Sequence, residues 1–183
     1  FKKRSTPFIK VGNIATSTFV GAGLTRSGGD KTRAFLKVQD GCDYKCSFCT
    51  IPKARGASRS LDTRTVLKKA RTAIMNGFKE IVLTGVNVGD YGRKEGGSFL
   101  ELLQALHEIK GLDRLKISSI EPNLLTDDII ALAGQSDRLV PHFHIPLQSG
   151  SDEMLSKMRR RYRSDLYRDR VETILTELPD AAI

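Results

Sequence analysis

The sequence of 183 residues lacks any apolar run of the ~18 residues that a transmembrane helix requires. Its first residues are basic, but no apolar segment of the kind found in a secretory signal peptide follows them. Cysteine is scarce: the chain has three, and an odd number in a chain of this length argues against a disulfide framework. We therefore expect a single-domain cytoplasmic protein with no membrane partner.

The three cysteines lie close together, at Cys42, Cys46 and Cys49, directly after an apolar segment. Three thiolates on one short loop can ligate three irons of a four-iron cluster, which leaves the fourth iron without a protein ligand. An iron with an open position can bind and act on a ligand, whereas a fully ligated cluster can only transfer electrons. The spacing therefore predicts a cluster with chemistry of its own.

A zinc site or plain burial in the core are the alternatives for the same three cysteines. A structural zinc site needs a fourth ligand, but His107 is distant along the chain, and His142 and His144 fall inside a later apolar run. We expect His144 to be a packed or hydrogen-bonded pocket residue and not a metal ligand. The cluster is favoured, and a zinc- or RNA-binding module stays the alternative.

Lysine and arginine outnumber aspartate and glutamate by 30 to 21, which gives a net charge of +9. An excess of this size indicates a polyanionic partner, because it raises the association rate and the affinity for phosphates. The basic residues concentrate at 53–71, beyond the cysteine loop, and at 157–163. Either group alone is more typical of a solvated surface than of a binding site, but the two groups together with the overall excess favour nucleic acid. RNA is the favoured partner if a base must be splayed out for chemistry.

Strand-like and helix-like segments alternate along most of the chain. Apolar runs predict strands at 34–39, 80–84, 115–120 and 139–145. Capping residues and helical periodicity predict helices at 62–76, from Ser98 onward, and at 126–133, 151–158 and 164–178. This alternation predicts an α/β fold with parallel strands and right-handed crossovers.

Each expected strand is followed by an unusual polar segment. These segments are the cysteine loop, 85–87, 121–123 and 144–151. Active sites of parallel β/α folds lie at the carboxyl ends of the strands, so we expect the four segments to share one pocket.

The chain resembles the radical S-adenosylmethionine (radical SAM) superfamily, and within it the methylthiotransferases. An aromatic residue, Phe48, directly precedes the third cysteine, as in the signature of that superfamily. The other matching segments are 39–42, 51–56, 83–87, 89–92, 118–122, 144–152 and 158–162. The Gly-Val-Asn and Gly-Asp-Tyr-Gly pattern at 85–92 looks most like enzymes that methylthiolate N6-threonylcarbamoyladenosine in tRNA.

This resemblance implies an open, partial parallel β/α barrel of the radical SAM type, with about four strands in this chain. It implies that Cys42, Cys46 and Cys49 hold a [4Fe–4S] cluster whose open iron chelates the amino and carboxylate groups of S-adenosylmethionine. The reduced cluster then cleaves the sulfonium to a 5′-deoxyadenosyl radical. In this arrangement Phe48 lies against the adenine.

The resemblance also implies roles for residues in the polar segments. Gly85 and Asn87 line the S-adenosylmethionine pocket, and Glu121 hydrogen-bonds the cofactor. Gln148 reaches the cofactor or the substrate. Arg160 pairs with the methionine carboxylate, for which a planar guanidinium is suited. Without the resemblance, each of these segments is equally typical of an ordinary turn or helix-entry loop.

The implied activity is the addition of a methylthio group to C2 of N6-threonylcarbamoyladenosine in tRNA; isopentenyladenosine in tRNA or a ribosomal protein are alternative substrates. The implied partners are the tRNA anticodon loop and a reducing electron donor, with no membrane and no DNA. Such enzymes also carry an N-terminal domain with a second [4Fe–4S] cluster and a small RNA-binding β-barrel, which this sequence lacks. We expect residues 1–31 to lead in from that missing domain. Residues 32–183 would be a core that ends before the barrel is complete, unable alone to perform the full reaction.

Overall fold

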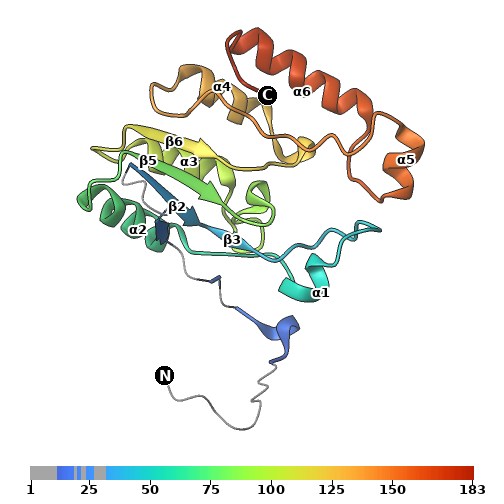
Figure 1. The fold of residues 1–183 in the computed structure, drawn as a ribbon, viewed down its shortest axis with the longest axis horizontal. Helices are drawn as coiled ribbons and strands as arrows, with labels where there is room; N and C mark the ends of the chain where they lie inside the picture. Colours follow the sequence, from blue (N-terminus) through green and yellow to red (C-terminus); the bar gives the residue numbers. More distant parts are fainter. Residues whose placement is uncertain (1–11, 19, 22–23, 27–31) are drawn as a thin grey trace.

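The computed structural model describes residues 12–18, 20–21, 24–26 and 32–183, and its centre is a four-stranded sheet (Figure 1). Three strands run parallel, β2 (Arg33–Lys37), β5 (Glu80–Thr84) and β6 (Arg114–Ile117), in the order β2-β5-β6. Strand β1 (Leu24–Arg26) pairs antiparallel with β2 at the sheet's edge. The parallel α/β fold that the sequence predicts is confirmed.

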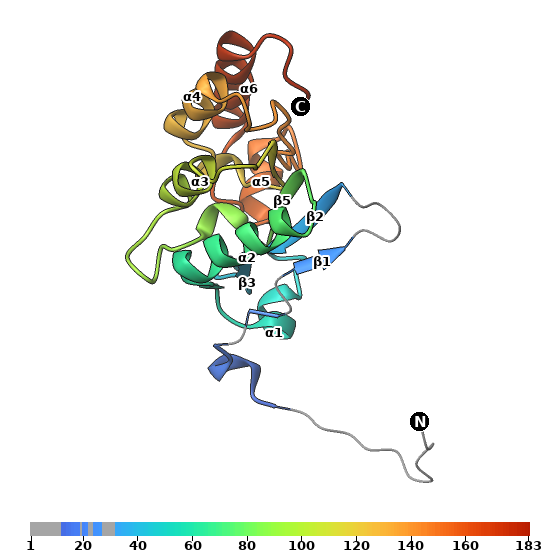
Figure 2. The same ribbon diagram turned by 90° about the vertical axis from the view of Figure 1, so that its left-hand side faces the viewer.

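Helices form a layer on one side of this sheet. Figure 2 shows α2, α3 and α4 one above the next beside the strands, with α6 against α4. Their bounds are α2 (Thr63–Met75), α3 (Phe99–His107), α4 (Asp127–Gln135) and α6 (Ser164–Glu177). The shorter helices are α1 (Ile51–Arg55), α5 (Asp152–Lys157) and the 3-10 turns η1 (Ile14–Thr16), η2 (Val88–Asp90) and η3 (Pro122–Leu124).

The helix starts follow the capping signals of the sequence. Asp62 precedes α2, and its side chain accepts a hydrogen bond from the Thr65 amide at 2.8 Å. Ser98 and Glu101 form a complete capping box at the start of α3. Each of these bonds gives an acceptor to an amide that the helix itself leaves unpaired.

The core lies between the sheet and the helix layer. Strand β5 is buried at Ile81, Val82 and Leu83, and of these Ile81 and Leu83 belong to the core. From the helix layer, Leu102 and Leu106 of α3 are both fully buried against it. This packing fixes the strand ends, and therefore the loops that follow them.

Residues 139–145 differ from the regular fourth strand that we expect from the sequence. Two isolated parallel bridges, at Leu139 and His144, join this segment to the chain of β6 and its continuation. Between them Pro141 has no amide hydrogen to donate, so a continuous ladder cannot form there. A third bridge pairs His142 with Ala182, on the next stretch of chain. Residues 139–145 therefore lie next to β6, as expected of a fourth strand, but they do not form a continuous strand.

Several short elements near the cysteines were not predicted. They are α1, β3 (Gln39–Asp40) and β4 (Arg59–Ser60). Of the expected lead-in 1–31, most residues lie outside those described, and β1 within it adds a strand to the sheet. Within the described ranges, no helix has both the length and the apolar character needed to cross a membrane.

Gly41, immediately before the first cysteine, supports a prediction about stability. Its φ is +71°, and an added Cβ would lie 2.0 Å from the Ala57 carbonyl oxygen. Gly77 has a φ of +86° with open space around it, so it isolates the cost of the backbone conformation. We predict that Gly77→Ala lowers the free energy of unfolding by about 1–2 kcal/mol. Gly41→Ala should cost about 3 kcal/mol or more, because steric overlap is added.

Urea denaturation with an unchanged m-value measures both losses. Equal losses in the two variants would contradict the close contact at Gly41.

Candidate functional site

The cysteine loop, residues 41–58, is closed at its base. Strands β3 and β4 pair antiparallel on its two sides. Within the loop, the Cys42 amide donates to the Gly56 carbonyl at 3.1 Å, and the Ser58 amide donates to the Asp43 carboxylate at 3.1 Å. The loop is therefore a folded unit that presents its cysteines in a defined order.

A buried carboxylate holds the base of this loop together. Asp40 is 3% exposed, and its Oδ2 lies 2.6 Å from Lys37 Nζ and 3.3 Å from Arg59 Nη2. Its Oδ1 accepts from the Gly41 amide at 2.9 Å. Burial by itself would raise the pKa of Asp40, but the Lys37 hydrogen bond and the nearby positive charges lower it below its ordinary value. Asp40 is therefore a carboxylate at neutral pH.

Gln39 joins the cysteine loop to the loop after β5. This side chain is fully buried, and its Nε2 donates to the Gly41 carbonyl at 2.7 Å and to Ser58 Oγ at 3.0 Å. Its Oε1 accepts from the amides of Val86 and Asn87, both at 2.9 Å. One amide group thus sets the position of the cysteines relative to Asn87.

The chain turn after α5 brings Arg160 to the cysteine loop. Arg159 has a left-handed φ of +57°, and the amides of residues 159 and 160 donate to helix carbonyls at 2.9 Å. These paired bonds form a Schellman motif, which reverses the chain direction at the helix end. The Ser47 amide donates to the Met158 carbonyl at 3.2 Å, so the turn and the loop are in contact.

The Arg160 guanidinium lies between a carboxylate and a thiol. Its Nη2 donates to Glu121 Oε2 in a short ion pair, and its Nη1 lies 3.2 Å from Cys46 Sγ. The side chain is only 4% exposed. Burial by itself would lower the pKa of Arg160, but the hydrogen bond and charge of Glu121 raise it above its ordinary value. A fixed positive charge therefore stands beside one cysteine.

The structure gathers the residues that the sequence singles out. A pocket of about 130 Å³ is lined by every predicted site residue except Gly85. These residues are Cys42, Cys46, Phe48, Cys49, Asn87, Glu121, Gln148 and Arg160. Gly85 lies beside the pocket, where an added Cβ would meet Gln39 Oε1 at 2.9 Å. The expected common pocket at the strand ends is present, while the role of each residue stays a prediction.

Asn87 is the group in this pocket that most clearly lacks a partner. Its side chain is buried, and neither its Nδ2 nor its Oδ1 has a hydrogen-bond partner of good geometry among the described residues, although the Tyr44 hydroxyl is close enough to interact with it. A buried amide without partners is costly, so such a group calls for a ligand that both donates and accepts. At the rim, Phe48 is 55% exposed, which leaves an aromatic face open. Both features fit S-adenosylmethionine, with its polar amino-acid end and flat adenine.

The three thiols are free and partly exposed, and all three face this pocket. Burial raises the pKa of Cys42, and the nearby Cys46 adds to the increase. Ligation of a metal by this cysteine would release its proton. Across the described ranges, no three His, Cys, Asp or Glu side chains converge as ligands of one ion. In an iron–sulfur cluster each thiolate binds a different iron, so the three cysteines need not converge on one ion. A donor set of three cysteines therefore fits a cluster.

One residue at this site, Tyr44, was not assigned a role from the sequence, and one that was, His144, lies elsewhere. Tyr44 is buried and lines the pocket, and its hydroxyl accepts from Asn123 Nδ2 at 2.8 Å. An aromatic residue within the cysteine spacing was the available signal. The expectation for His144 was wrong, because its side chain is exposed and outside the pocket. Phe143 and Ile145 on either side point into the core, so His144 points outward.

The Gln39 contacts lead to a testable prediction. Gln39→Leu keeps the side chain's approximate size but leaves the Val86 and Asn87 amides without their acceptor. We expect a loss of about 3 kcal/mol in the free energy of unfolding, since each buried unpaired group costs about 1–3 kcal/mol. Gln104→Leu, at an exposed position on α3, is the control and should change stability little. Urea denaturation measures both; similar effects in the two variants would contradict the assigned contacts.

Comparison with known proteins gives a consistent result. The family model described as "Radical SAM superfamily" matches residues 36–179. The chain is 44% identical over 156 residues to the threonylcarbamoyladenosine tRNA methylthiotransferase MtaB of Bacillus subtilis (strain 168), covering 84% of this chain and 35% of that protein. It is 40% identical over 152 residues to a tRNA-2-methylthio-N(6)-dimethylallyladenosine synthase of Parafrankia sp. (strain EAN1pec), covering 82% of this chain and 31% of that one. The chain thus spans about a third of the length of these relatives.

Solved structures show the same fold. The radical S-adenosylmethionine methyltransferase TsrM from Kitasatospora setae, with tryptophan substrate and a SAM analogue bound, superposes with a TM-score of 0.64 at 15% identity. That match covers 84% of this chain and 29% of TsrM. The resemblance to methylthiotransferases expected from the sequence is confirmed. With the family match and the shared fold, these findings establish that the chain belongs to the radical SAM superfamily.

Proposed function

We propose that this chain is the core of an enzyme that adds a methylthio group to C2 of N6-threonylcarbamoyladenosine in tRNA. The observation that carries the proposal is one pocket that holds three free thiols beside the unpartnered amide of Asn87. The 44% identity to a threonylcarbamoyladenosine tRNA methylthiotransferase supports the choice of reaction. The net charge of +9 supports a polyanionic substrate.

The proposal includes parts that lie beyond this chain. The intact enzyme would use the tRNA anticodon loop as substrate, a reducing electron donor, and a second [4Fe–4S] cluster in a preceding domain to which residues 1–31 lead. Unprotected cluster thiols require a reducing compartment, which supports the cytoplasm as its location. The core alone would not complete the reaction.

Each pocket residue has a specific part in this proposal. Cys42, Cys46 and Cys49 would ligate a [4Fe–4S] cluster, which with S-adenosylmethionine supplies reductive cleavage of a carbon–sulfur bond. Arg160 donates toward Cys46 Sγ, and a donor to a ligating sulfur tunes the potential of a cluster. Asn87 would supply the buried donor and acceptor for the bound cofactor.

The remaining residues would shape the cofactor position. Phe48 offers its open face to the adenine, and Gln148, with a left-handed φ of 62°, extends to the cofactor or substrate. Glu121 holds the Arg160 guanidinium in place, and Gly85 leaves room for Gln39. Arg160 is then presented to a cofactor carboxylate in a fixed orientation.

The similarity to a dimethylallyladenosine synthase at 40% identity supports a second candidate substrate. Anaerobically reconstituted intact enzyme, given tRNA carrying either threonylcarbamoyladenosine or dimethylallyladenosine, separates the two. Mass spectrometry of digested tRNA should show methylthio addition on the first. Addition on the second alone would replace the proposed substrate, and addition on neither would overturn the proposed function.

Cysteine ligation leads to a direct prediction. Cys46→Ala should reduce iron loading after anaerobic reconstitution to near zero and abolish 5′-deoxyadenosine formation, because a thiolate ligand is lost. Ser47→Ala is the matched control, since Ser47 is adjacent and exposed. Iron analysis and chromatography of the nucleoside measure both outcomes. Unchanged iron in Cys46→Ala would contradict the ligand assignment, and one equivalent of zinc without iron in the wild type would favour the zinc module.

Glu121 leads to a second prediction. Glu121→Gln keeps the shape of the side chain but removes the charge that pairs with Arg160. We expect the KM for S-adenosylmethionine to rise about ten- to a hundredfold, since hydrogen bonds to charged groups contribute about 1.5–3 kcal/mol. Glu153→Gln, on an exposed pair with Lys157, is the control. The rate of 5′-deoxyadenosine formation against cofactor concentration measures the effect. An unchanged KM would show that Arg160 needs no such support.

A further inference from the structure

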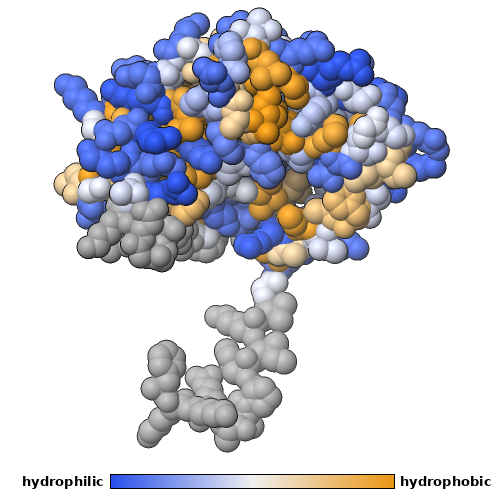
Figure 3. Space-filling view, turned by 45° about the horizontal axis from the view of Figure 1, so that its top comes forward, coloured by the Kyte–Doolittle hydropathy of each residue, from blue (hydrophilic) through white to orange (hydrophobic). Residues whose placement is uncertain are grey.

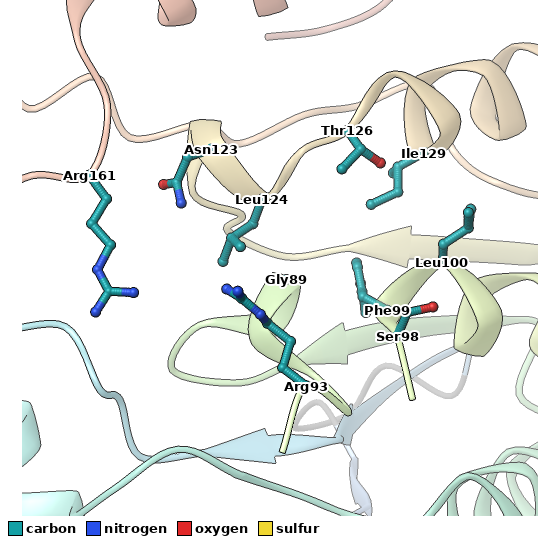
Figure 4. A pocket seen from close by; sticks show the side chains of 10 residues that line it. All are labelled: Gly89, Arg93, Ser98, Phe99, Leu100, Asn123, Leu124, Thr126, Ile129 and Arg161. Carbon is teal, nitrogen blue, oxygen red and sulfur yellow. The ribbon is translucent and has the colours of Figure 1, made fainter. Parts of the chain in front are cut away.

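A second and larger hollow lies next to the cofactor pocket, with a volume of about 520 Å³. One wall is formed by η2 and the start of α3, and the other by η3 and the start of α4 (Figure 4). No cysteine contributes to its lining. None of the roles assigned above uses it.

The two ends of this hollow differ in chemistry. Figure 4 shows Arg93 and Arg161 toward one end, and Leu100 and Ile129 toward the other. The Arg93 side chain is 56% exposed and lies 3.5 Å from Asp90. Arg161 donates from Nη2 to the backbone carbonyl of Asp43 at 3.3 Å, and its charge acts on the Asp43 carboxylate without forming an ion pair in the part of the chain that the structure describes. The hollow is therefore cationic at one end and apolar at the other.

The cationic end is separated from the cofactor pocket by a single side chain. Asn123 lines the hollow and donates to the hydroxyl of Tyr44, which lines the cofactor pocket. Arg161 also lines the hollow, and its guanidinium lies 3.9 Å from the centre of the Tyr44 ring. A ligand in the hollow would therefore be a near neighbour of a molecule reacting in the cofactor pocket.

We propose that this hollow binds a nucleotide that flanks the modified one in the RNA substrate, with its phosphate at Arg93 and Arg161 and its base at the apolar end. This proposal rests on the proposed function, because it assumes an RNA substrate. A nucleotide has the same division into an anion and a flat apolar ring, and guanidinium groups bind phosphate oxygens in pairs. Bases in single-stranded loops are unstacked and free to enter such a site.

Charge complementarity favours RNA over a protein domain as the occupant. The chain carries a net charge of +9, and two of its arginines line this one hollow. Stacking of a base on an aromatic side chain contributes about 1–3 kcal/mol, and Phe99 is the aromatic residue in the lining of this hollow. Because it lies beside the cofactor pocket, the hollow would contact the nucleotide next to the modified one. The enzyme would thereby select the RNA sequence around its target.

Two variants of the intact protein test this proposal without touching the cofactor pocket. Arg93→Gln removes one charge, and Arg114→Gln, 62% exposed at the start of β6, is its charge-matched control. Thr126→Glu places an anion at the hollow, and Thr126→Gln is its neutral control. Thr126 is exposed and makes no side-chain capping bond, and an acidic residue at a helix start is favourable, so stability should hold.

The measurement is the affinity for an anticodon stem-loop RNA by fluorescence anisotropy at several salt concentrations. Arg93→Gln should weaken binding about fivefold and reduce the salt slope by about 0.7, the value for one phosphate of a single strand. Thr126→Glu should weaken binding at least as much, while both controls bind like the wild type. Formation of 5′-deoxyadenosine without RNA should be unchanged in all four variants.

The possible outcomes separate this proposal from the function on which it rests. Wild-type affinity and salt slope in both test variants would overturn the nucleotide site, whether or not tRNA is methylthiolated. Normal RNA binding together with weakened association of another protein domain would also overturn it, in favour of a protein-docking surface. Failure of the wild-type enzyme to modify any tRNA would overturn the proposed function instead, and no variant is needed to see it.

Discussion

The site depends first on one buried amide side chain. The cysteines and Asn87 come from different loops, and nothing in either loop alone fixes the distance between them. Gln39 does so because its amide nitrogen bonds the cysteine loop while its oxygen accepts two amides of the other loop. Such a bridge is oriented, since a side-chain amide has a donor end and an acceptor end that cannot be exchanged without losing bonds. The two halves of the pocket are thereby held in one arrangement.

Two buried charged groups of opposite sign, Arg160 and Asp40, lie near the cysteines, and each has a partner of opposite charge. The guanidinium of Arg160 is buried, which is costly unless a partner offsets it, and Glu121 is that partner. Cys46 lies on its other side, so a deprotonated sulfur there would meet an existing positive charge. At the base of the loop, the negatively charged Asp40 forms ion pairs with Lys37 and Arg59. Each buried charge is therefore paired locally.

Local sequence signals predicted much of this fold. The limits of α2 and β5 follow from capping residues and an apolar run, and the common pocket follows from the rule that parallel strands end at one edge. Features that depend on register between distant segments were not predictable in the same way. Pro141 interrupts the pairing of 139–145, and the alternation around Phe143 directs His144 outward. The contact between Tyr44 and Asn123 spans 79 positions and has no local signal.

The left-handed turn at Arg159 has a consequence for neighbouring chemistry. Because the chain reverses there, two consecutive arginines diverge: one enters the cysteine pocket, and the next stacks on Tyr44 at the edge of the larger hollow. The same turn therefore positions both guanidinium groups, those of Arg160 and Arg161. A β-branched residue in place of Arg159 adopts this left-handed backbone poorly, so it would displace the side chains of Arg160 and Arg161 together. The cysteine pocket and the larger hollow would then change shape together.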